Sequence, residues 1–333
     1  MTSPLQAPRR ILLTGGAGFI GSHLCERLIA AGNQVTVFDD FNDYYDPQLK
    51  RRNLAAVASS ISLVEADIRD AVAVERCFTK GAFDTVIHLA ARAGVRPSIL
   101  NPKLYMTTNI EGTFNLLDAC VHHGVGNFVF SSSSSVYGVN ELSPFSEKDP
   151  ILRTISPYAA TKLASEQICS NYSHLFGIRM RCLRFFTVYG PRQRPDLAIA
   201  RFARAILDGQ PITRFGSGES RRDYTYIDDI IEGIVRSIND ASGDFKIINL
   251  GGHATTSLNE LIGLLERVIG REAVIEDAPE QPGDVPATFA DVTEARVCLG
   301  WEPQVALAEG LERYVAWLKQ QDAAAGWNTE QKP

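Results

Sequence analysis

Residues 11–21 read ILLTGGAGFIG and decide the fold class of this chain. The run ILLT is typical of a buried strand, and the glycine-rich stretch after it is typical of a tight turn into a helix. Gly15 and Gly18 allow the turn and a close approach of a ligand to the backbone, and Gly21 allows the helix to pack on the strand. Several backbone N–H groups and the positive helix end then converge on one point, which suits a pyrophosphate.

Short β-branched runs and segments with helical spacing alternate through the first half of the chain. The predicted strands, each expected to be buried, are residues 11–14, 34–38, 61–66, 85–90, 127–131 and 181–186. Helical segments are expected over residues 19–32 and 105–124, each closed by a glycine. This alternation predicts an α/β protein with a doubly wound parallel sheet, the Rossmann arrangement.

A carboxylate at the end of the second predicted strand identifies the cofactor. Asp39 lies 18 residues beyond Gly21, where a carboxylate accepts hydrogen bonds from the adenosine ribose of a dinucleotide. Asp40 and Asp43 come next with no adjacent arginine, so a ribose 2′-phosphate would meet repulsion. The sequence therefore predicts NAD rather than NADP.

The pattern becomes less regular after Phe186, where proline and glycine cluster in GPRQRP, FGSGES and EQPGD. We expect residues 1–186 to form an NAD-binding Rossmann domain, with residues 222–247 returning to it. Residues 187–333 are expected to form mainly a smaller C-terminal substrate-binding domain. A chain of 333 residues is long enough for two such domains.

The composition excludes several classes of function. With 33 basic and 39 acidic residues the net charge is −6, which lacks the basic excess of a nucleic-acid binder. No apolar run approaches the roughly 18 residues of a membrane span, so no membrane partner is expected. The six histidines form no metal-ligand motif, so no metal is predicted. The six cysteines contain no CxxC pair, and the N-terminus lacks a signal-peptide pattern, which together favour the cytoplasm.

A second motif points to acid–base chemistry. Ser156 and Pro157 look like the N-cap and first position of a helix that is expected to reach Phe176. Tyr158 and Lys162 then lie four residues apart on one helix face. The lysine ammonium, the helix N-terminus and a nicotinamide cation would favour the phenolate, so we expect a lowered tyrosine pKa. The sequence predicts Tyr158 as a general base.

Together, TGGAGFIG, SSSSSVYG and YAATK resemble the extended short-chain dehydrogenase/reductases, and the resemblance continues through RRDYTYIDD, PGD and LGWEP over nearly the whole chain. It implies that Ser133 hydrogen-bonds the sugar hydroxyl being oxidised, that Tyr158 moves its proton, and that Lys162 holds the nicotinamide ribose. The predicted cofactor-binding residues are Gly15, Gly18, Phe19, Ile20, Gly21, Asp39, Asp67, Ile68, Ala90, Ala91, Asn109, Ser131, Tyr158, Lys162 and Phe185.

Members of this family that act on nucleotide sugars differ in the chemical step that comes after oxidation at C4 of the sugar. The dehydratases carry an Asp-Glu pair in the serine cluster, where this chain has Ser134 and Ser135. Without a second acid and base, the simplest completion returns the hydride to the opposite face of a turned 4-keto sugar. The resemblance therefore implies 4-epimerisation of a UDP-sugar.

Residues 42–54, 90–98, 184–198 and 283–291 resemble UDP-glucuronate 4-epimerases most, which implies conversion of UDP-glucuronate to UDP-galacturonate. Arginine suits the two oxygens of a carboxylate, and whether Arg192 or Arg194 holds the sugar carboxylate stays open. The resemblance places Arg222 at the UDP diphosphate and Arg96 near the sugar. The predicted substrate-binding residues are Arg96, Ser133, Ser134, Ser135, Thr187, Arg192, Arg194, Arg222 and Asp284.

Three other functions stay open at this point. The first is 4-epimerisation of UDP-glucose or UDP-N-acetylglucosamine. The second is decarboxylation of UDP-glucuronate, because oxidation at C4 creates a β-keto acid; the decarboxylases usually show an NTYGPRM-like segment where this chain has TVYGPRQRP. The third is a non-catalytic NAD-sensing protein. The resemblance also implies a homodimer in which helices near residues 107–122 and 158–176 form a four-helix bundle.

Overall fold

The computed structural model describes residues 8–140, 142–252, 254–279 and 285–324. Its centre is a seven-stranded sheet in the order β10-β6-β5-β4-β1-β2-β3, and each neighbouring pair is parallel. The strands are β1 (Arg10–Thr14), β2 (Gln34–Asp39), β3 (Ile61–Glu65), β4 (Thr85–His88), β5 (Asn127–Ser133), β6 (Arg179–Phe185) and β10 (Phe245–Leu250). The predicted doubly wound α/β fold is confirmed.

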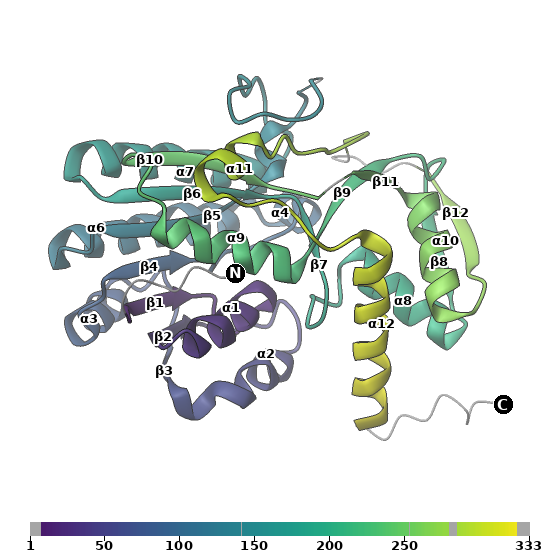
Figure 1. Ribbon diagram of the computed structural model, residues 1–333, viewed down its shortest axis with the longest axis horizontal. Coiled ribbons are helices and arrows are strands. Elements are labelled where there is room, and N and C mark those ends of the chain that lie inside the picture. Colours follow the sequence, from purple (N-terminus) through teal and green to yellow (C-terminus); the bar gives the residue numbers. More distant parts are fainter. Residues whose placement is uncertain (1–7, 141, 253, 280–284, 325–333) are drawn as a thin grey trace.

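Helices cover both faces of this sheet (Figure 1). One face carries α1 (Phe19–Ala30) and α9 (Ile227–Asn239), and the other carries α3 (Ala71–Gly81), α6 (Gly112–His123) and α7 (Pro157–Phe176). Because side chains alternate along a strand, Ile11 and Leu13 of β1 pack in the first layer while Leu12 packs in the second. The strands therefore have apolar side chains on both faces, as parallel strands between two helix layers require.

A group of elements that we call the side lobe lies at the right of Figure 1. It contains a three-stranded sheet, a two-stranded sheet and three helices: β7 (Thr187–Tyr189), β9 (Arg221–Tyr226), β11 (Thr255–Ser257), β8 (Pro211–Phe215), β12 (Val274–Ala278), α8 (Ala198–Asp208), α10 (Leu258–Ile269) and α12 (Leu307–Ala324). One cluster of buried residues runs from Ile11 in β1 to Leu318 in α12. The domain boundary near residue 186 stays a prediction.

The remaining elements are short and connect the main ones. They are α2 (Pro47–Leu54), a 3₁₀ helix (Ala55–Ser60), α4 (Val95–Leu100), α5 (Pro102–Met106), a π-helix (Thr107–Glu111), a second 3₁₀ helix (Ser134–Tyr137) and α11 (Thr293–Leu299).

One local expectation from the sequence is wrong, and a second is confirmed with a difference in detail. Strand β3 was expected to be buried, but it is an edge strand and its Ser62, Leu63 and Glu65 are exposed. The helical pattern over residues 105–124 is interrupted by the π-helix, which holds Asn109 buried between two other segments. A π-helix adds a residue to one turn and thereby redirects side chains, which a 3.6-residue periodicity does not reveal.

Helix α7 begins and ends as the sequence predicts. The Ser156 side chain accepts a hydrogen bond from the Ala159 N–H at 3.1 Å, Pro157 is the first helical residue, and Gly177 comes after the helix in the left-handed conformation.

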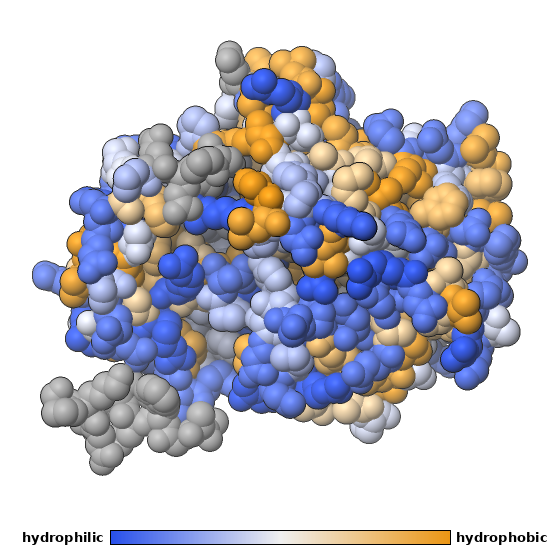
Figure 2. Space-filling model, turned by 180° about the vertical axis from the view of Figure 1, so that it is seen from behind, coloured by the Kyte–Doolittle hydropathy of each residue, from blue (hydrophilic) through white to orange (hydrophobic). Residues whose placement is uncertain are grey.

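The face opposite to that of Figure 1 is mainly hydrophilic, with apolar side chains gathered in separate groups (Figure 2). Within the described ranges, no helix is both long and apolar enough to cross a membrane.

Candidate active site

A cavity of about 380 Å³ crosses the carboxyl ends of β1, β2, β4, β5 and β6. We call it the sheet-edge cavity. All the predicted cofactor-binding residues except Asn109 line it. Ligands of doubly wound sheets bind at this edge because the strand order reverses there and leaves a crevice. The chain therefore brings the glycine turn and the Tyr158–Lys162 helix to one place.

The glycine turn forms the floor of this cavity. Its conformation is fixed by hydrogen bonds from the Gly15 N–H to the Phe38 carbonyl and from the Gly18 N–H to the Gly15 carbonyl, at 2.8 and 3.1 Å. Gly15 has a φ of +70°, and a Cβ at Gly21 would overlap the Gly15 carbonyl. No side chain caps helix α1, so its first N–H groups are left for a ligand. These donors fit the pyrophosphate of a dinucleotide.

Asp39 lies where the sequence predicts, at the end of β2, and is almost completely buried. Its carboxylate accepts hydrogen bonds from the N–H groups of Ala17 and Phe41, both at 3.0 Å. Burial raises the pKa of this carboxyl, and the two hydrogen bonds oppose that shift. The sequence showed no arginine adjacent to it, but folding brings Lys50 and Arg92 into the wall of the same cavity.

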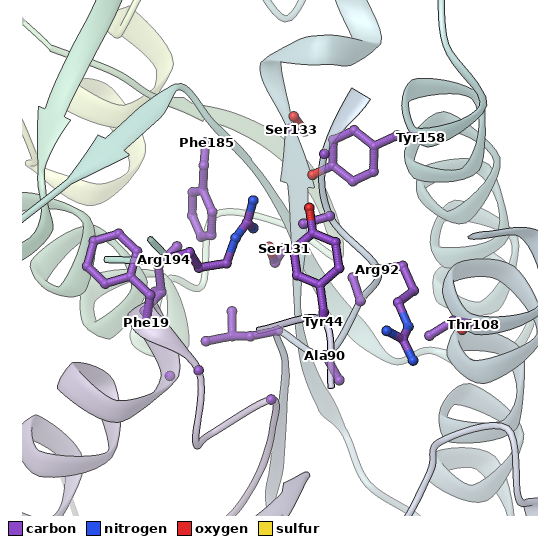
Figure 3. Close-up of a pocket in the computed structure, with 18 of the residues that line it drawn as sticks. Phe19, Tyr44, Ala90, Arg92, Thr108, Ser131, Ser133, Tyr158, Phe185 and Arg194 are labelled. Atoms are coloured by element: carbon purple, nitrogen blue, oxygen red, sulfur yellow. The ribbon is translucent and has the colours of Figure 1, made fainter. Parts of the chain in front are cut away.

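The three predicted catalytic residues line the other end of the cavity, and Figure 3 shows Ser133 near the Tyr158 ring. The Ser133 hydroxyl is close enough to the phenol to lower its pKa, and it donates to the Ser135 hydroxyl at 3.2 Å. The Lys162 Nζ donates to the Ser131 carbonyl at 2.6 Å and lies 4.8 Å from the Phe130 ring centre. Burial lowers the pKa of Lys162 to about 8.

The expected lowering of the Tyr158 pKa is wrong for the chain by itself. Burial raises this pKa, and it outweighs the hydrogen bond with Ser133 and the charge of Arg194, which lower it. Lys162 is not among the main contributions to this pKa, and its ammonium donates to the Ser131 carbonyl. Tyr158 is therefore protonated near neutral pH in the protein alone.

Arg194 lies in the sheet-edge cavity, and it is the arginine of the Arg192–Arg194 pair that the structure brings there. Its Nε and Nη2 donate to the two oxygens of Asp196, each at 2.9 Å. The guanidinium carbon lies 5.3 Å from the Tyr44 ring centre, and the Tyr44 hydroxyl donates to Asp196 at 3.3 Å. Arg192 instead pairs with Glu26 at 2.7 Å, outside this cavity.

The other predicted substrate residues divide between two cavities. Ser133, Ser135 and Thr187 line the sheet-edge cavity, whereas Ser134 does not. Arg96 and Arg222 line a neighbouring cavity in the side lobe, which we call the lobe cavity. Asp284 lies outside the described residues.

Asn109 has a supporting position rather than a place in the cavity wall. Its side chain accepts from the Arg92 N–H at 2.8 Å and donates to the Arg92 carbonyl at 3.0 Å and to the Thr161 hydroxyl at 3.0 Å. It thereby fixes the backbone of Arg92, which does line the cavity. The π-helix provides this placement.

Sequence reasoning missed four residues of this site: Tyr44, Lys50 and Arg92, which line the cavity, and Asp196, which binds Arg194. Tyr44 and Lys50 belong to the run NDYYDPQLK, whose unusual pair of tyrosines between acidic residues was the available signal. Among the described residues, no group of three or more His, Cys, Asp or Glu side chains could hold a metal ion.

The fold, the dinucleotide-binding turn and the Ser-Tyr-Lys cluster define an NAD-dependent enzyme of the short-chain dehydrogenase/reductase kind. Residues 11–251 match the NAD dependent epimerase/dehydratase family, and the chain belongs to that family. The match to this NAD-dependent family confirms the predicted cofactor, NAD.

Particular relatives have similar sequences over nearly their whole length. The chain is 42% identical to a UDP-glucuronate 4-epimerase of Thermodesulfobacterium geofontis, over 93% of this chain and 96% of that protein. It is 37% identical to the UDP-glucuronic acid 4-epimerase of Bacillus cereus solved with UDP-glucuronic acid and NAD, with a TM-score of 0.87 over 93% and 99% of the chains.

A UDP-glucose 4-epimerase of Thermotoga maritima, solved with UDP-glucose, is equally similar in structure. It is 36% identical, with a TM-score of 0.87 over 93% of this chain and 99% of that one. Backbone similarity therefore does not distinguish a charged sugar from a neutral one, and side chains in the cavities must do so.

Proposed function

We propose that this protein converts UDP-glucuronate to UDP-galacturonate by NAD-dependent 4-epimerisation. The observation that carries the proposal is the position of Arg194, whose guanidinium lies in the same cavity as Ser133 and Tyr158. A guanidinium suits a carboxylate because it offers parallel N–H donors and a fixed charge. The names of the similar proteins support the same choice of sugar.

The sheet-edge cavity would hold NAD along the ends of the strands. The glycine turn and the N-terminus of α1 would bind the pyrophosphate, and Asp39 the adenosine ribose. When bound, NAD supplies reversible oxidation at C4 of the sugar.

Ser133 and Tyr158 would handle the proton of the C4 hydroxyl. Tyr158 accepts this proton as the 4-keto sugar forms and gives it back when the hydroxyl is restored. Ser133, whose hydroxyl lies close to the phenol, would orient the sugar hydroxyl. The cation that lowers the pKa of the phenol in the protein alone is Arg194. Lys162, whose pKa burial lowers to about 8, would hold the nicotinamide ribose.

The distribution of carboxylates favours epimerisation over loss of water. Among the described residues that line the sheet-edge cavity, the carboxylates are Asp39, Asp40 and Asp67. All three lie at or just beyond the ends of β2 and β3, at the opposite side of the sheet from β5 and Tyr158. None of these three can serve as a second acid or base beside Tyr158, and Asp196 of the neighbouring cavity is held in an ion pair by Arg194, so elimination lacks its catalyst.

Thr187 and Arg194 would hold the C6 carboxylate, and both line the cavity. Decarboxylation is easiest when the C–CO₂ bond stands perpendicular to the plane of the 4-keto group. Anchors that hold the carboxylate nearer that plane slow this loss. A hydroxyl and a guanidinium can serve both ring orientations, as turnover of the sugar requires.

The lobe cavity would hold the nucleotide. Its wall contains Arg96 and Arg222, whose charges suit a diphosphate, together with Phe215 and Tyr224, whose rings suit a base. The Arg96 guanidinium carbon lies 5.2 Å from the Phe215 ring centre. Leu197 lines both cavities, so a UDP-sugar could extend from one into the other.

We also propose a cytoplasmic homodimer, in which α6 and α7 of two copies form a four-helix bundle. Phe114 of α6 and Phe176 of α7 are 46% and 52% exposed, as is expected of residues that a second copy covers. Both pack against Tyr172 of α7, which makes the apolar area continuous. The six cysteines are free, in agreement with a reducing compartment.

The proposed reaction is tested by incubating the protein separately with UDP-glucuronate, UDP-glucose and UDP-N-acetylglucosamine and resolving the products by NMR. We expect UDP-galacturonate from the first substrate and little conversion of the other two. Conversion of the neutral sugars without conversion of UDP-glucuronate would contradict the assignment. A UDP-pentose product would instead indicate decarboxylation, and no product from any of the three would favour a non-catalytic protein.

A further inference from the structure

The ion pair between Arg194 and Asp196 lies at the junction of the two cavities. Arg194 lines the sheet-edge cavity, whereas Asp196 lines the lobe cavity. Figure 3 shows the Arg194 side chain extending beside the Tyr44 ring toward the centre of the site. A UDP-sugar that occupies both cavities must pass this pair, so its charges act directly on the substrate.

The pairing leaves one part of the guanidinium for a second acceptor. Asp196 takes Nε and Nη2, and Nη1 makes no hydrogen bond with the described residues. A substrate carboxylate on Nη1 would share one cation with Asp196. Two carboxylates on one guanidinium repel each other. The Arg194 side chain is 20% exposed and the Asp196 side chain is 42% exposed, so water screens part of this repulsion.

Asp196 is a lasting negative charge at this point. Burial raises the pKa of Asp196, but the hydrogen bonds and the charge of Arg194 outweigh burial and lower the pKa overall. Burial likewise lowers the pKa of Arg194, and Asp196 raises it by more. Both groups are therefore ionised throughout the neutral range.

We propose that Asp196 is a specificity-determining residue that weakens the hold of Arg194 on the C6 group of the sugar. This inference rests on the proposed function. The ring must turn between the two steps at C4, so the carboxylate has to leave one position and bind again in another. A guanidinium shared with Asp196 releases the carboxylate more readily than an unshared one.

The same pair governs the response to a neutral sugar. With Asp196 present, Arg194 keeps a partner when the C6 group is a hydroxymethyl. Without it, a neutral sugar would leave a charge unpaired in a largely buried place, which is costly. Asp196 therefore narrows the difference in affinity between UDP-glucuronate and UDP-glucose.

Loss of Asp196 would also remove a contact that orients the Arg194 guanidinium. This loss by itself would raise KM for UDP-glucuronate. Removal of the negative charge has the larger effect on KM, because the Tyr44 ring also orients the guanidinium. The Tyr44 ring faces it at 5.3 Å, and most of the side chain is enclosed. Arg194 should thus stay in the cavity when its aspartate partner becomes an amide.

The test is Asp196→Asn, assayed with UDP-glucuronate and UDP-glucose. We expect KM for UDP-glucuronate to fall by roughly 10-fold, as removal of one nearby like charge predicts. The kcat of the variant with UDP-glucuronate should fall several-fold, because Arg194 releases the sugar carboxylate more slowly. KM for UDP-glucose should stay equal or rise, and Kd for UDP should be unchanged.

Two further variants make the result specific. Asp196→Glu keeps the charge and should return KM for UDP-glucuronate toward the parental value. Tyr44→Phe removes a donor that partly neutralises Asp196, so KM for UDP-glucuronate should rise, opposite to the effect of Asp196→Asn. The matched control is Asp277→Asn, which breaks a bidentate pair with Arg214 in the side lobe and should change none of these constants.

An unchanged or increased KM for UDP-glucuronate in Asp196→Asn would overturn the inference, as would an equal change for both sugars. If the amide variant does not fold, a lower KM in Tyr44→Phe would overturn it. Failure of the parent protein to convert UDP-glucuronate would contradict the proposed function instead, so the two failures are distinguishable.

Discussion

The two cavities use different means to place ligand-binding groups. The sheet-edge cavity relies on backbone amides, glycines and strand ends, whose positions are determined by the parallel sheet itself. The lobe cavity and the loop after β7 rely on arginine side chains, whose positions depend on partners such as Asp196 and Glu26. A motif can therefore locate the first kind of site, whereas the second requires knowledge of the ion pairs.

The largest expected effect tests the chemistry at the sheet edge. Tyr158→Phe keeps the ring but removes the group that moves the proton, so kcat should fall by roughly 10² to 10⁴. NAD should remain bound, because the glycine turn is untouched; cofactor content after purification checks this. Activity within a few-fold of the parent would remove Tyr158 from its role.

The next effect concerns the stability of the sheet region. Arg184 of β6 and Glu166 of α7 form a completely buried pair with hydrogen bonds of 2.9 and 2.8 Å. Glu166→Ala leaves the guanidinium unpaired, so the free energy of unfolding should fall by roughly 3–5 kcal/mol. Urea denaturation measures it. Glu309→Ala, which breaks an exposed pair with Arg313, is the control and should cost about 0.5 kcal/mol or less. An equal loss of unfolding free energy in the two variants would contradict the expected difference between a buried and an exposed ion pair.

A smaller effect is expected in the loop after β7. Arg194→Ala should weaken binding of UDP-glucuronate by roughly 1.5–3 kcal/mol, the value of a charge-assisted contact, and should spare UDP. Calorimetric titration with each ligand measures both affinities. An equal loss for the two would show that Arg194 binds phosphate, and it would remove the main structural support for glucuronate. Arg192→Ala, which breaks the pair with Glu26, is the matched control and should change neither.

The smallest effect is a change in the pH dependence of stability. Burial, with a smaller contribution from the charge of Lys162, lowers the pKa of His88 to about 3. The ring contacts the hydroxyls of Thr14 and Thr113 at 2.7 and 3.0 Å. Between pH 6.5 and 3 the unfolded chain binds a proton here that the folded chain does not, so stability falls as the pH falls.

His88→Asn removes the group that binds this proton. The free energy of unfolding should then depend less on pH, by up to about 1.4 kcal/mol per pH unit below about pH 6.5. Unfolding free energies at about pH 7, 6 and 5 check the slope, which does not depend on the overall stability lost with the two hydroxyl contacts. Parallel curves for parent and variant would contradict a neutral His88 in the folded state.

The sequence was informative wherever local chemistry determines structure. The glycine turn, Asp39 and the Ser156 cap depend on contacts within a few residues or on the order of strands. The departures from expectation have non-local causes. Strand β3 is exposed because no further strand among the described residues pairs with its outer edge, and the interruption before α6 depends on Asn109 binding Arg92 and Thr161.

Tyr44, which was missed from the sequence, and Arg192, whose place was left open, depend on long-range pairing, whereas Asp196 lies two positions from its partner Arg194. Tyr44 reaches Asp196 across 152 positions, and Arg192 reaches Glu26 across 166. Neither spacing leaves a pattern in a single sequence. Two neighbouring arginines of the same loop thus differ in location because their carboxylate partners differ.

The most direct test of the central claim tracks the hydrogen at C4. UDP-glucuronate deuterated at C4 is incubated with the purified protein, without added cofactor, in ordinary water. We expect UDP-galacturonate that retains deuterium at C4, because the same hydrogen leaves and returns while the sugar stays bound. Loss of the deuterium to solvent, or a product formed only when NAD is added in proportion to it, would contradict transient oxidation at C4 by a retained cofactor.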